Sequence, residues 1–566
     1  MKEKSTYDVI VVGSGISGGW AVKEMTEAGL TVLLLDRGRD LPHVSGYTTA
    51  TAMPWDLPHR GRMTRALKAK FPIQSVEGNY PIHEANADFW LPEAEQPYVQ
   101  DEPFDWFRSS VVGGKSLLWG RQVYRWSDLD FEANAREGIA IDWPIRYQDI
   151  VPWYAHVERF IGVSGQSLGL RHLPDSVFQP PMPLNCVETM VQEKLNLAYG
   201  QERILTIGRV AHITEATEEQ KALGRSSCQY RNACSQGCPY GAYFSTQAAT
   251  LPAAQRTGNL TVRPHSLVTQ VLYDDAKNKA TGVEVFDTQT KELHRFTARV
   301  IFLNASTVAT TQILLQSTSV SFPDGLGNSS GLVGKNLMDH HSRVNISGKI
   351  PGWENYVTFG RRANGIFIPR YRNVGADKRP YLRGFDFQGG AGRGRGQRTE
   401  AEFGADLKDA QTRWGEWYFG LSGWGETLPY EDNTVTLHPT LKDPYGLPQL
   451  VIKASIKENE RLMREDMAQD AQEIMELIGA TDIKLTKLEN PPIGRSKHEM
   501  GTARMGRDPK SSVLNGFNQV WDCPNVFVTD GAAMTSSGCV NPSLTYMALT
   551  ARACAYAIHQ LKTRQV

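Results

Sequence analysis

The sequence has few cysteines, no excess charge of either sign and no long apolar run. Seven cysteines among 566 residues are too few for a disulfide scaffold. Lys and Arg number 61 and Asp and Glu number 61, which disfavours nucleic-acid binding because that role needs positive excess. No apolar stretch approaches the roughly 18 residues of a membrane-spanning helix. We therefore expect a soluble globular protein with at least two domains, since one domain holds roughly 100–200 residues.

The amino terminus carries a short apolar segment followed by a glycine-rich turn. The apolar core, Val9–Val12, is too short for a signal peptide and follows acidic residues, so we predict a buried β-strand there. A helix to about Ala28 and a second strand over 31–35, which ends at Asp36, are predicted next. This order of strand, turn, helix and strand is typical of a dinucleotide-binding unit.

The turn has the spacing G-x-G-x-x-G. Gly13 permits the tight turn, Gly15 lets the backbone approach a pyrophosphate, and Gly18 allows the helix to pack closely on the strand. Asp36 stands at the distance expected of the acid that binds a ribose hydroxyl. The spacing favours an ADP-containing cofactor over a turn that binds nothing, but it does not distinguish NAD from FAD.

Three further segments are consistent with such a cofactor. Gly113-Gly114 with Lys115-Ser116 can place backbone N–H groups against a phosphate or a flavin ring. Residues 259–285 read as strands with a turn near 274–279. At the carboxyl end a buried strand, Val526–Val528, leads to Asp530-Gly531, and Asn541-Pro542-Ser543 opens a helix that runs through His559. A strand and a helix so far from the amino terminus indicate that both ends of the chain complete one domain.

Together these motifs resemble the glucose–methanol–choline (GMC) family of FAD oxidoreductases, and they occur in the family's order over almost the whole chain. The motifs are VVGSGISGG with Asp36, VVGGKSLLWG, GLVGKNLMDHH at 331–341, HEMGTARMG at 498–506, VTDGAAM and NPSLTYMALTARA. The resemblance implies an α/β fold (α+β overall), in which a discontinuous Rossmann-like FAD-binding domain joins a substrate domain with a mainly antiparallel sheet.

The resemblance also implies boundaries and cofactor contacts. The FAD-binding domain is expected over 1–130, 205–345 and 496–566, the substrate domain over 346–495, a connecting helical segment over 131–204 and an iron–sulfur loop over 225–245. The expected FAD-binding residues are Gly13, Gly15, Gly18, Asp36, Arg37, Gly113, Gly114, Ser116, Val268, Asp530, Gly531, Pro542 and Ser543. Some relatives bind flavin covalently through a His after Gly-Gly, but this loop has none, so we expect non-covalent FAD.

The catalytic pair of the family maps to His498 and Asn541. Hydride removal from a carbinol carbon is easier as the hydroxyl proton leaves, and an imidazole can accept that proton near neutral pH. The resemblance therefore implies that His498 is the general base and that Asn541 donates a hydrogen bond to the developing alkoxide. Taken alone, His498 also fits a surface loop and Asn541 also fits a helix cap.

Three of the cysteines, Cys228, Cys234 and Cys238, fall within eleven residues. Three thiols without a nearby His are unusual for structural zinc, whereas close spacing that ends in Cys-Pro favours an iron–sulfur cluster. The segment resembles the insertion of sugar dehydrogenases in this family, whose three cysteines carry a [3Fe-4S] centre. The alternatives are a [4Fe-4S] centre with a ligand from elsewhere, a local disulfide with a spare thiol, or reduced buried cysteines.

Aromatic residues alternate along the chain between about 348 and 489, which predicts a sheet with one face available for binding. Candidate sugar contacts there are Arg383, Asp386, Gln388 and Trp424, and the alternative is that they form the core of the sheet. We expect the glycine- and arginine-rich segment 389–398 to be a mobile loop or lid.

The branch that the chain resembles is that of the glucoside 3-dehydrogenase catalytic subunits. This implies an FAD-dependent dehydrogenase that oxidises a secondary ring hydroxyl to a 3-keto-glycoside and passes electrons through the cluster to a cytochrome c-type acceptor. It also implies a small signal-bearing subunit and periplasmic location by co-export, with the cytoplasm as the alternative. Other candidate functions are an oxidase or dehydrogenase for another alcohol, such as glucose at C1 or gluconate, and a non-redox FAD-containing lyase.

Overall fold

The computed structural model describes residues 5–75, 82–358, 362–395 and 403–565. Its amino-terminal unit is a strand, a helix and a parallel strand, as the glycine spacing predicts: β1 (Thr6–Val12), α1 (Ile16–Glu27) and β2 (Val32–Leu35). Side chains alternate along β1, so residues 9 and 11 enter the core under α1 while residues 10 and 12 enter the core on the other face.

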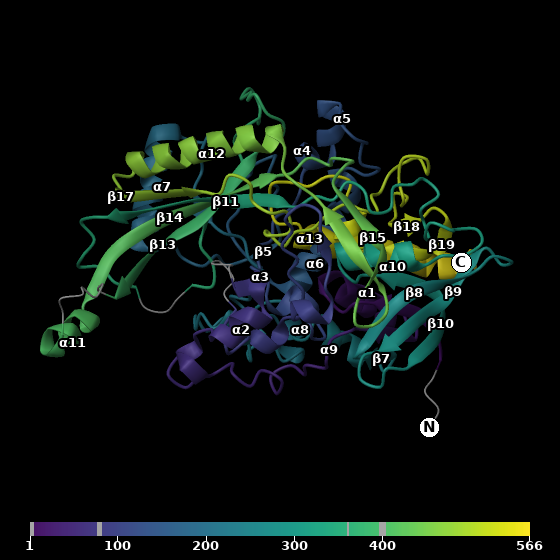
Figure 1. The fold of residues 1–566 in the computed structure, drawn as a ribbon. Helices are drawn as coiled ribbons and strands as arrows, with labels where there is room; N and C mark the ends of the chain where they lie inside the picture. Colours follow the sequence, from purple (N-terminus) through teal and green to yellow (C-terminus); the bar gives the residue numbers. More distant parts are fainter. Residues whose placement is uncertain (1–4, 76–81, 359–361, 396–402, 566) are drawn as a thin grey trace.

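An eight-stranded sheet combines the two ends of the chain (Figure 1). Its hydrogen-bonded order is β18, β19, β10, β1, β2, β7, and the pair β8 and β9 continues from β10 by antiparallel contacts. The added strands are β7 (Leu260–Arg263), β8 (Ser266–Asp274), β9 (Lys279–Asp287), β10 (Leu293–Leu303), β18 (Gln519–Val520) and β19 (Cys523–Val528). Because β19 pairs in parallel with β10, the carboxyl end lies beside the amino-terminal unit. The long carboxyl-terminal helix α13 (Ser543–Lys562) packs against α1.

A second, six-stranded sheet has the order β17, β11, β14, β13, β12, β6 and is antiparallel throughout. Its strands are β6 (Thr206–Ile207), β11 (His340–Ile350), β12 (Ile366–Ile368), β13 (Phe385–Arg395), β14 (Trp414–Glu426) and β17 (Thr481–Lys487). The helices α7 (Cys186–Tyr199) and α12 (Glu458–Leu477) bury their apolar side chains against one face of this sheet, and α12 lies across it in Figure 1. The opposite face of this six-stranded sheet is turned toward the first sheet. The fold class is therefore the predicted one.

The remaining elements are short or connect the two sheets. They are α2 (Arg65–Lys70), α3 (Pro72–Ser75), β3 (Val99–Gln100), α4 (Asp128–Phe131), α5 (Ala133–Glu137), α6 (Tyr147–Ile161), β4 (Val163–Ser164), β5 (Phe178–Gln179), α8 (Glu218–Ala222), α9 (Thr250–Gln255), α10 (Thr307–Gln316), α11 (Gly404–Thr412), β15 (Thr434–Lys442) and β16 (Pro448–Lys453). A search of the described residues finds no helix with the length and apolar character needed to cross a membrane.

The strand pairing crosses the expected boundaries at two points and places most of the expected mobile loop in a strand. β6 lies within the segment 205–345 that was expected to belong to the FAD-binding domain, but it pairs with β12 in the second sheet. β15 and β16 lie in the expected substrate segment, yet β16 pairs with β3 from the amino-terminal part of the chain. Residues 389–395 of the expected mobile loop belong to β13, because backbone pairing with β14 continues through them; residues 396–398 lie outside the described residues.

Candidate active site

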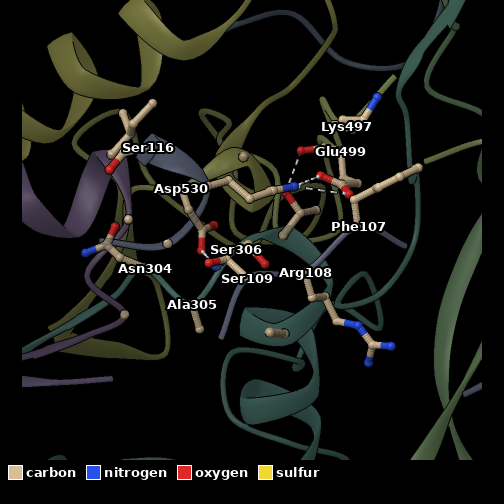
Figure 2. Close-up of a pocket in the computed structure, with 18 of the residues that line it drawn as sticks. Phe107, Arg108, Ser109, Ser116, Asn304, Ala305, Ser306, Lys497, Glu499 and Asp530 are labelled. Atoms are coloured by element: carbon tan, nitrogen blue, oxygen red, sulfur yellow. Dashed lines mark hydrogen bonds and ion pairs between the residues drawn. The ribbon is translucent and has the colours of Figure 1, made fainter. Parts of the chain in front are cut away.

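A cavity of about 400 Å³ lies between the two sheets and is lined by segments from both ends of the chain. The glycine-rich turn, the start of α10, the 113–122 loop and the carboxyl-terminal segment before α13 all contribute to its wall. Figure 2 shows Ser306 and Asp530 together on one side of the cavity, with Lys497 and Glu499 on another. The volume lies within the range of small-molecule and cofactor sites.

The three glycines of the turn have different surroundings. A Cβ at Gly13 or Gly18 would overlap the backbone, that of Asn304 in the first case and that of Gly13 in the second. Gly13 also has a φ of +90°, which only glycine adopts without strain. Gly15 is different, because a Cβ there would meet nothing within 4 Å. The backbone at Gly15 is therefore open toward the cavity, as a close approach to a pyrophosphate requires.

Asp36 lines the cavity at the end of β2 and is held by the glycine-rich turn. Its carboxylate accepts hydrogen bonds from the backbone N–H and hydroxyl of Ser14 and from the backbone N–H of Gly38, which lies 2.7 Å away. Burial raises the pKa of Asp36, although these hydrogen bonds oppose that shift. Its neighbour Arg37 also lines the cavity and donates a hydrogen bond to Gln96.

The Gly113-Gly114 loop closes over the turn. Gly113 has a φ of +93° and donates its N–H to the hydroxyl of Ser14 at 2.6 Å, so the two glycine-rich segments are joined directly. The Ser116 hydroxyl donates to the Gly113 carbonyl and accepts from the backbone N–H of Thr246. Gly114 and Ser116 line the cavity, whereas Gly113 shapes the wall behind them.

The helices that begin at the cavity without a side chain capping their first turn include α1, whose first residue follows Gly15, and α13, whose cap residue is Pro542. Their free N–H groups and positive dipole ends suit an anionic group. Between them Asp530 accepts hydrogen bonds from the backbone N–H of Ser306 and from the hydroxyl of Thr310.

Ten of the expected FAD-binding residues line this one cavity. They are Gly13, Gly15, Asp36, Arg37, Gly114, Ser116, Val268, Asp530, Gly531 and Ser543. The other three, Gly18, Gly113 and Pro542, stand directly behind the lining. The open backbone at the turn and the two uncapped helices fit the diphosphate of FAD, so the residues present suit that cofactor.

His498 reaches the cavity through a hydrogen-bonded chain that determines its tautomer. Nε2 of His340 lies against the carbonyl oxygen of Gly538, which can only accept, so this nitrogen carries the proton. Burial lowers the pKa of His340 to about 4, so its other nitrogen, Nδ1, is an acceptor. Nδ1 of His498 lies 2.9 Å from that atom and must donate to it. Nε2 of His498 is therefore left with its lone pair facing the cavity.

Asn541 faces the same point. Its Oδ1 accepts a hydrogen bond from Nε2 of Gln388 at 2.9 Å, and its Nδ2 lies 3.5 Å from Nε2 of His498. Asn541 does not cap α13, because the cap position belongs to Pro542 and no side-chain cap bond forms. The Gln388 contact turns the N–H groups of Asn541 toward His498, so one donor and one basic nitrogen lie side by side in the cavity wall.

The electrostatic surroundings keep His498 neutral. Burial, followed by the influence of His340, Lys497 and Lys115, holds the pKa of His498 well below its usual value. Lys115 also forms an ion pair with Glu499 at 3.0 Å, and both residues line the cavity. His498 is half-buried and lines the cavity, so it is not a histidine of an exposed surface loop.

Asp339 and His340 position the base, although the sequence assigned neither a role. Asp339 accepts hydrogen bonds from the backbone N–H groups of His340, Ser496 and His498, each within 3.0 Å. Burial raises the pKa of Asp339 to about 7. These contacts join the start of β11 to the loop that carries His498. The pair Asp-His in the motif GLVGKNLMDHH was the available signal.

Two of the four predicted sugar contacts lie outside the lining of the cavity. Arg383 does not line the cavity, because its buried guanidinium pairs with Glu137 and with Glu426, the latter at 3.4 Å. Asp386 is also outside the lining; its carboxylate is fully buried, and burial raises its pKa well above the usual value. Gln388 and Trp424 do line the cavity, and the ring centroid of Trp424 lies 5.8 Å from that of His498.

A second, smaller cavity of about 30 Å³ is lined by all three clustered cysteines. Every cysteine of the chain is free, and the three are partly exposed. Burial raises the pKa of Cys228, and the Arg121 charge opposes the shift. Within the described residues, only Asp339, His340 and His498 bring three candidate ligand atoms within 4.8 Å of one another. The three sulfurs therefore do not all lie within 4.8 Å of one another, whereas thiolates on one zinc ion stand about 3.8 Å apart.

Comparison with known proteins identifies a family and several relatives that match most of the chain. Models of the family described as GMC oxidoreductase match residues 7–342 and 429–550. A relative named 2-methyl-1,2-propanediol dehydrogenase, from Mycolicibacterium austroafricanum, is 29% identical over 96% of this chain and 94% of its own. The fructose dehydrogenase large subunit of Gluconobacter japonicus is 25% identical over 99% of each chain. The crystal structure of pyridoxine 4-oxidase from Mesorbium loti has a TM-score of 0.60 and 18% identity, covering 98% of this chain and 99% of that one.

Proposed function

Because the chain belongs to the GMC oxidoreductase family, we propose that it is an FAD-dependent dehydrogenase that oxidises a secondary ring hydroxyl of a sugar or glycoside, giving a 3-keto-glycoside. The observation that carries this proposal is the convergence of Nε2 of His498 and Nδ2 of Asn541 beside the cavity that suits non-covalent FAD. A base and a donor that meet at one point are what alcohol oxidation requires.

The side chains have distinct tasks in this reaction. Nε2 of His498 takes the proton of the substrate hydroxyl, and Nδ2 of Asn541 donates a hydrogen bond to the oxygen as negative charge develops. Bound FAD would accept the hydride that leaves the carbon bearing this hydroxyl. The C–H and O–H bonds break and a carbonyl forms. Gln388 keeps Asn541 oriented, and Trp424 offers an apolar wall beside His498 on which a sugar ring can stack.

A sugar is favoured by the lining and by one relative. The fructose dehydrogenase large subunit, similar over the full length of both chains, has a sugar in its name. Gln388 and Trp424, from the second sheet, supply an amide and an aromatic face, which together suit a polar ring with apolar faces. Oxidation at the 3-position rests on the sequence resemblance to glucoside 3-dehydrogenases.

We further propose that Cys228, Cys234 and Cys238 hold an iron–sulfur cluster, with [3Fe-4S] favoured by the three ligands. All three line one small cavity, and no Asp or Glu belongs to its lining. The expectation that no His is near was wrong, because His212 also lines this cavity, with its Nε2 3.9 Å from Sγ of Cys234. The spacing of the three cysteines beyond that of single-ion ligands suits a cluster, in which each sulfur binds a different iron. The cluster would carry electrons one at a time from FAD to an external acceptor that is neither oxygen nor NAD.

The two cavities share a wall, which supports this electron path. Trp119 lines the large cavity and donates its indole N–H to the carbonyl of Phe244 at 2.9 Å. The preceding residue, Tyr243, lines the cysteine cavity. Arg121 also lines the large cavity, and its guanidinium lies 5.3 Å from the centroid of the Tyr243 ring. One or two side chains therefore separate the proposed flavin and cluster sites.

The first test is anaerobic addition of methyl glucoside to the FAD-loaded protein. We expect the flavin absorbance to bleach and the product to be the 3-keto-glycoside. Bleaching by glucose with a C1 lactone as product would instead assign the alternative glucose dehydrogenase. An unchanged spectrum across a panel of sugars, with polyols or gluconate active instead, would reject the sugar assignment, and product formation without flavin reduction would indicate a lyase.

The second test is iron analysis with electron paramagnetic resonance of the oxidised protein. Cys234→Ser should lose iron and the cluster signal while it retains FAD. Cys186→Ser is the matched control, because Cys186 is also free and partly exposed but begins α7 and does not line the cavity. Iron-free protein with full dehydrogenase activity would contradict the proposed electron path.

Partners and location remain proposals of the same kind. We propose a small signal-bearing subunit, a cytochrome c-type acceptor and periplasmic location by co-export. Fractionation of cells that express both subunits, with and without the small one, tests the location. Enzyme that stays in the cytoplasm when both subunits are present would contradict it.

A further inference from the structure

The segment from about residue 41 to 75 packs directly against the cysteine loop. A Cβ added at Gly237 would run into the ring of Tyr47, and the guanidinium of Arg231 donates to the carbonyl of Ala50. Tyr47 and Ala50 share one apolar cluster with Met63 and Leu67 from the same segment. The part of this segment that contacts the cysteine loop and the part that forms α2 therefore belong to one packed unit.

The charged residues in part of this segment are all of one sign. Residues 57–75 contain five Lys and Arg residues and no Asp or Glu, although the whole chain is neutral. The five are exposed, and they form no ion pair within the described part of the chain: Arg60, Arg62, Arg65, Lys68 and Lys70. Unpaired positive charges gathered in this way attract an anionic surface over about a Debye length.

Large apolar side chains are exposed at the same place. Trp55 is 74% exposed, Met53 and Val44 are each 49% exposed, and Tyr240, which lines the cysteine cavity, is 39% exposed. Val44, Met53 and Trp55 belong to one short segment, and apolar side chains that are exposed together mark a site of contact with another molecule. Apolar residues bordered by charge are the usual composition of a transient docking surface.

We infer that Met53, Trp55 and the basic residues 60–70 form the docking face for a protein electron acceptor that presents an acidic surface. The inference deepens the proposed function and rests on its electron path through the cysteine cavity. The basic residues steer the acceptor, and Trp55 with Met53 supplies a small dry contact next to the point where electrons leave. Electron-transfer partners bind through small, weak interfaces, which a patch of this size can provide.

The test uses two small oxidants of opposite charge, ferricyanide and hexaammineruthenium(III), on the FAD- and cluster-loaded enzyme. The enzyme is reduced with dithionite, freed from excess reductant, and mixed with each oxidant in a stopped-flow instrument. The variant carries Arg62→Glu, Arg65→Glu and Lys68→Glu. At about 10 mM ionic strength we expect it to react at least about 10-fold more slowly with ferricyanide and faster with the ruthenium complex. At about 1 M salt the differences should vanish.

The control variant changes the same charge elsewhere. Lys277→Glu, Lys279→Glu and Arg295→Glu alter three exposed residues of the β8 to β10 hairpins, on the right of Figure 1 while α2 lies at lower left. We expect this control to match the wild type with both oxidants. Equal rates in all three proteins, or an equal effect in the control, would overturn the inference.

Three additional measurements separate the remaining outcomes. Iron analysis and methyl glucoside bleaching on the same samples show whether the proposed function itself fails, whereas dithionite reduction makes the docking test independent of substrate. Cosedimentation with vesicles rich in anionic phospholipid tests a membrane as the occupant. Vesicle binding at physiological salt that the triple variant abolishes would assign this face to a membrane and overturn the acceptor.

Discussion

Replacement of His340 by Ala should slow substrate oxidation while it leaves FAD and substrate binding intact. His340 does not line the large cavity, but its Nδ1 accepts the hydrogen bond from Nδ1 of His498 at 2.9 Å. Without that acceptor, the Nδ1–H of His498 is left buried without a partner, and the ring can rotate or exchange its proton to Nε2. Either change removes the lone pair that faces Asn541.

The size of the effect follows from the unpaired group. A buried donor without a partner costs about 1–3 kcal/mol, and about 1.4 kcal/mol corresponds to a tenfold change in rate. If the whole cost falls on the reactive orientation of His498, the limiting rate of flavin reduction falls about 5-fold to 150-fold. His340→Asn should recover part of this loss, because its side-chain oxygen can stand near the position of the imidazole Nδ1.

The assay is anaerobic flavin bleaching at increasing methyl glucoside concentration, which separates the limiting rate from the apparent dissociation constant. The matched control is His341→Ala. His341 is equally buried and adjacent, but its ring lies beside Gly425 and 3.5 Å from the guanidinium of Arg464, away from the cavity. It should lower thermal stability and keep the limiting rate. A normal limiting rate in His340→Ala, or an equal loss in His341→Ala, would refute the proposed role of His340.

Three further predictions follow from other contacts. Arg383→Ala should lower the free energy of unfolding by about 3–5 kcal/mol, because it leaves Glu426 buried with one cation fewer; denaturant titration measures this, and weaker sugar binding at unchanged stability would restore Arg383 as a substrate contact. Gly15→Ala should fold normally and weaken FAD binding in a fluorescence titration. Gly18→Ala should fail to fold stably, because of the two added Cβ atoms only the one at Gly18 would overlap the backbone; equal behaviour of the two variants would contradict the geometry. Because the pKa of His498 lies well below 6.5, the limiting rate should stay constant as pH falls through 6.5 and decline only at lower pH, where His498 gains its proton; a decline centred above pH 6.5 would disagree.

The errors of prediction in the second sheet have a common physical cause. Period-two alternation places Asp386 and Gln388 on one face of β13, and in the structure Asp386 pairs with Trp424 of β14 in the expected antiparallel manner. What covers that face depends on segments remote in sequence. Asp386 lies close enough to Tyr124 and Cys539 for its charge to raise the pKa of both, so Asp386 is enclosed while Gln388 reaches the cavity. Alternation contains no information about such covering segments.

Local chain geometry determined the parts that the sequence predicted well. The tight turn at Gly13 and the strand and helix around it depend on neighbouring residues, so their spacing identifies the cofactor-binding unit. The tautomer of His498 was decided only by the tertiary structure, because its partner His340 stands 158 residues away. Asp339 brings these two segments together by accepting their backbone N–H groups, and the motif that contains Asp339 does not by itself identify a partner so distant in the chain.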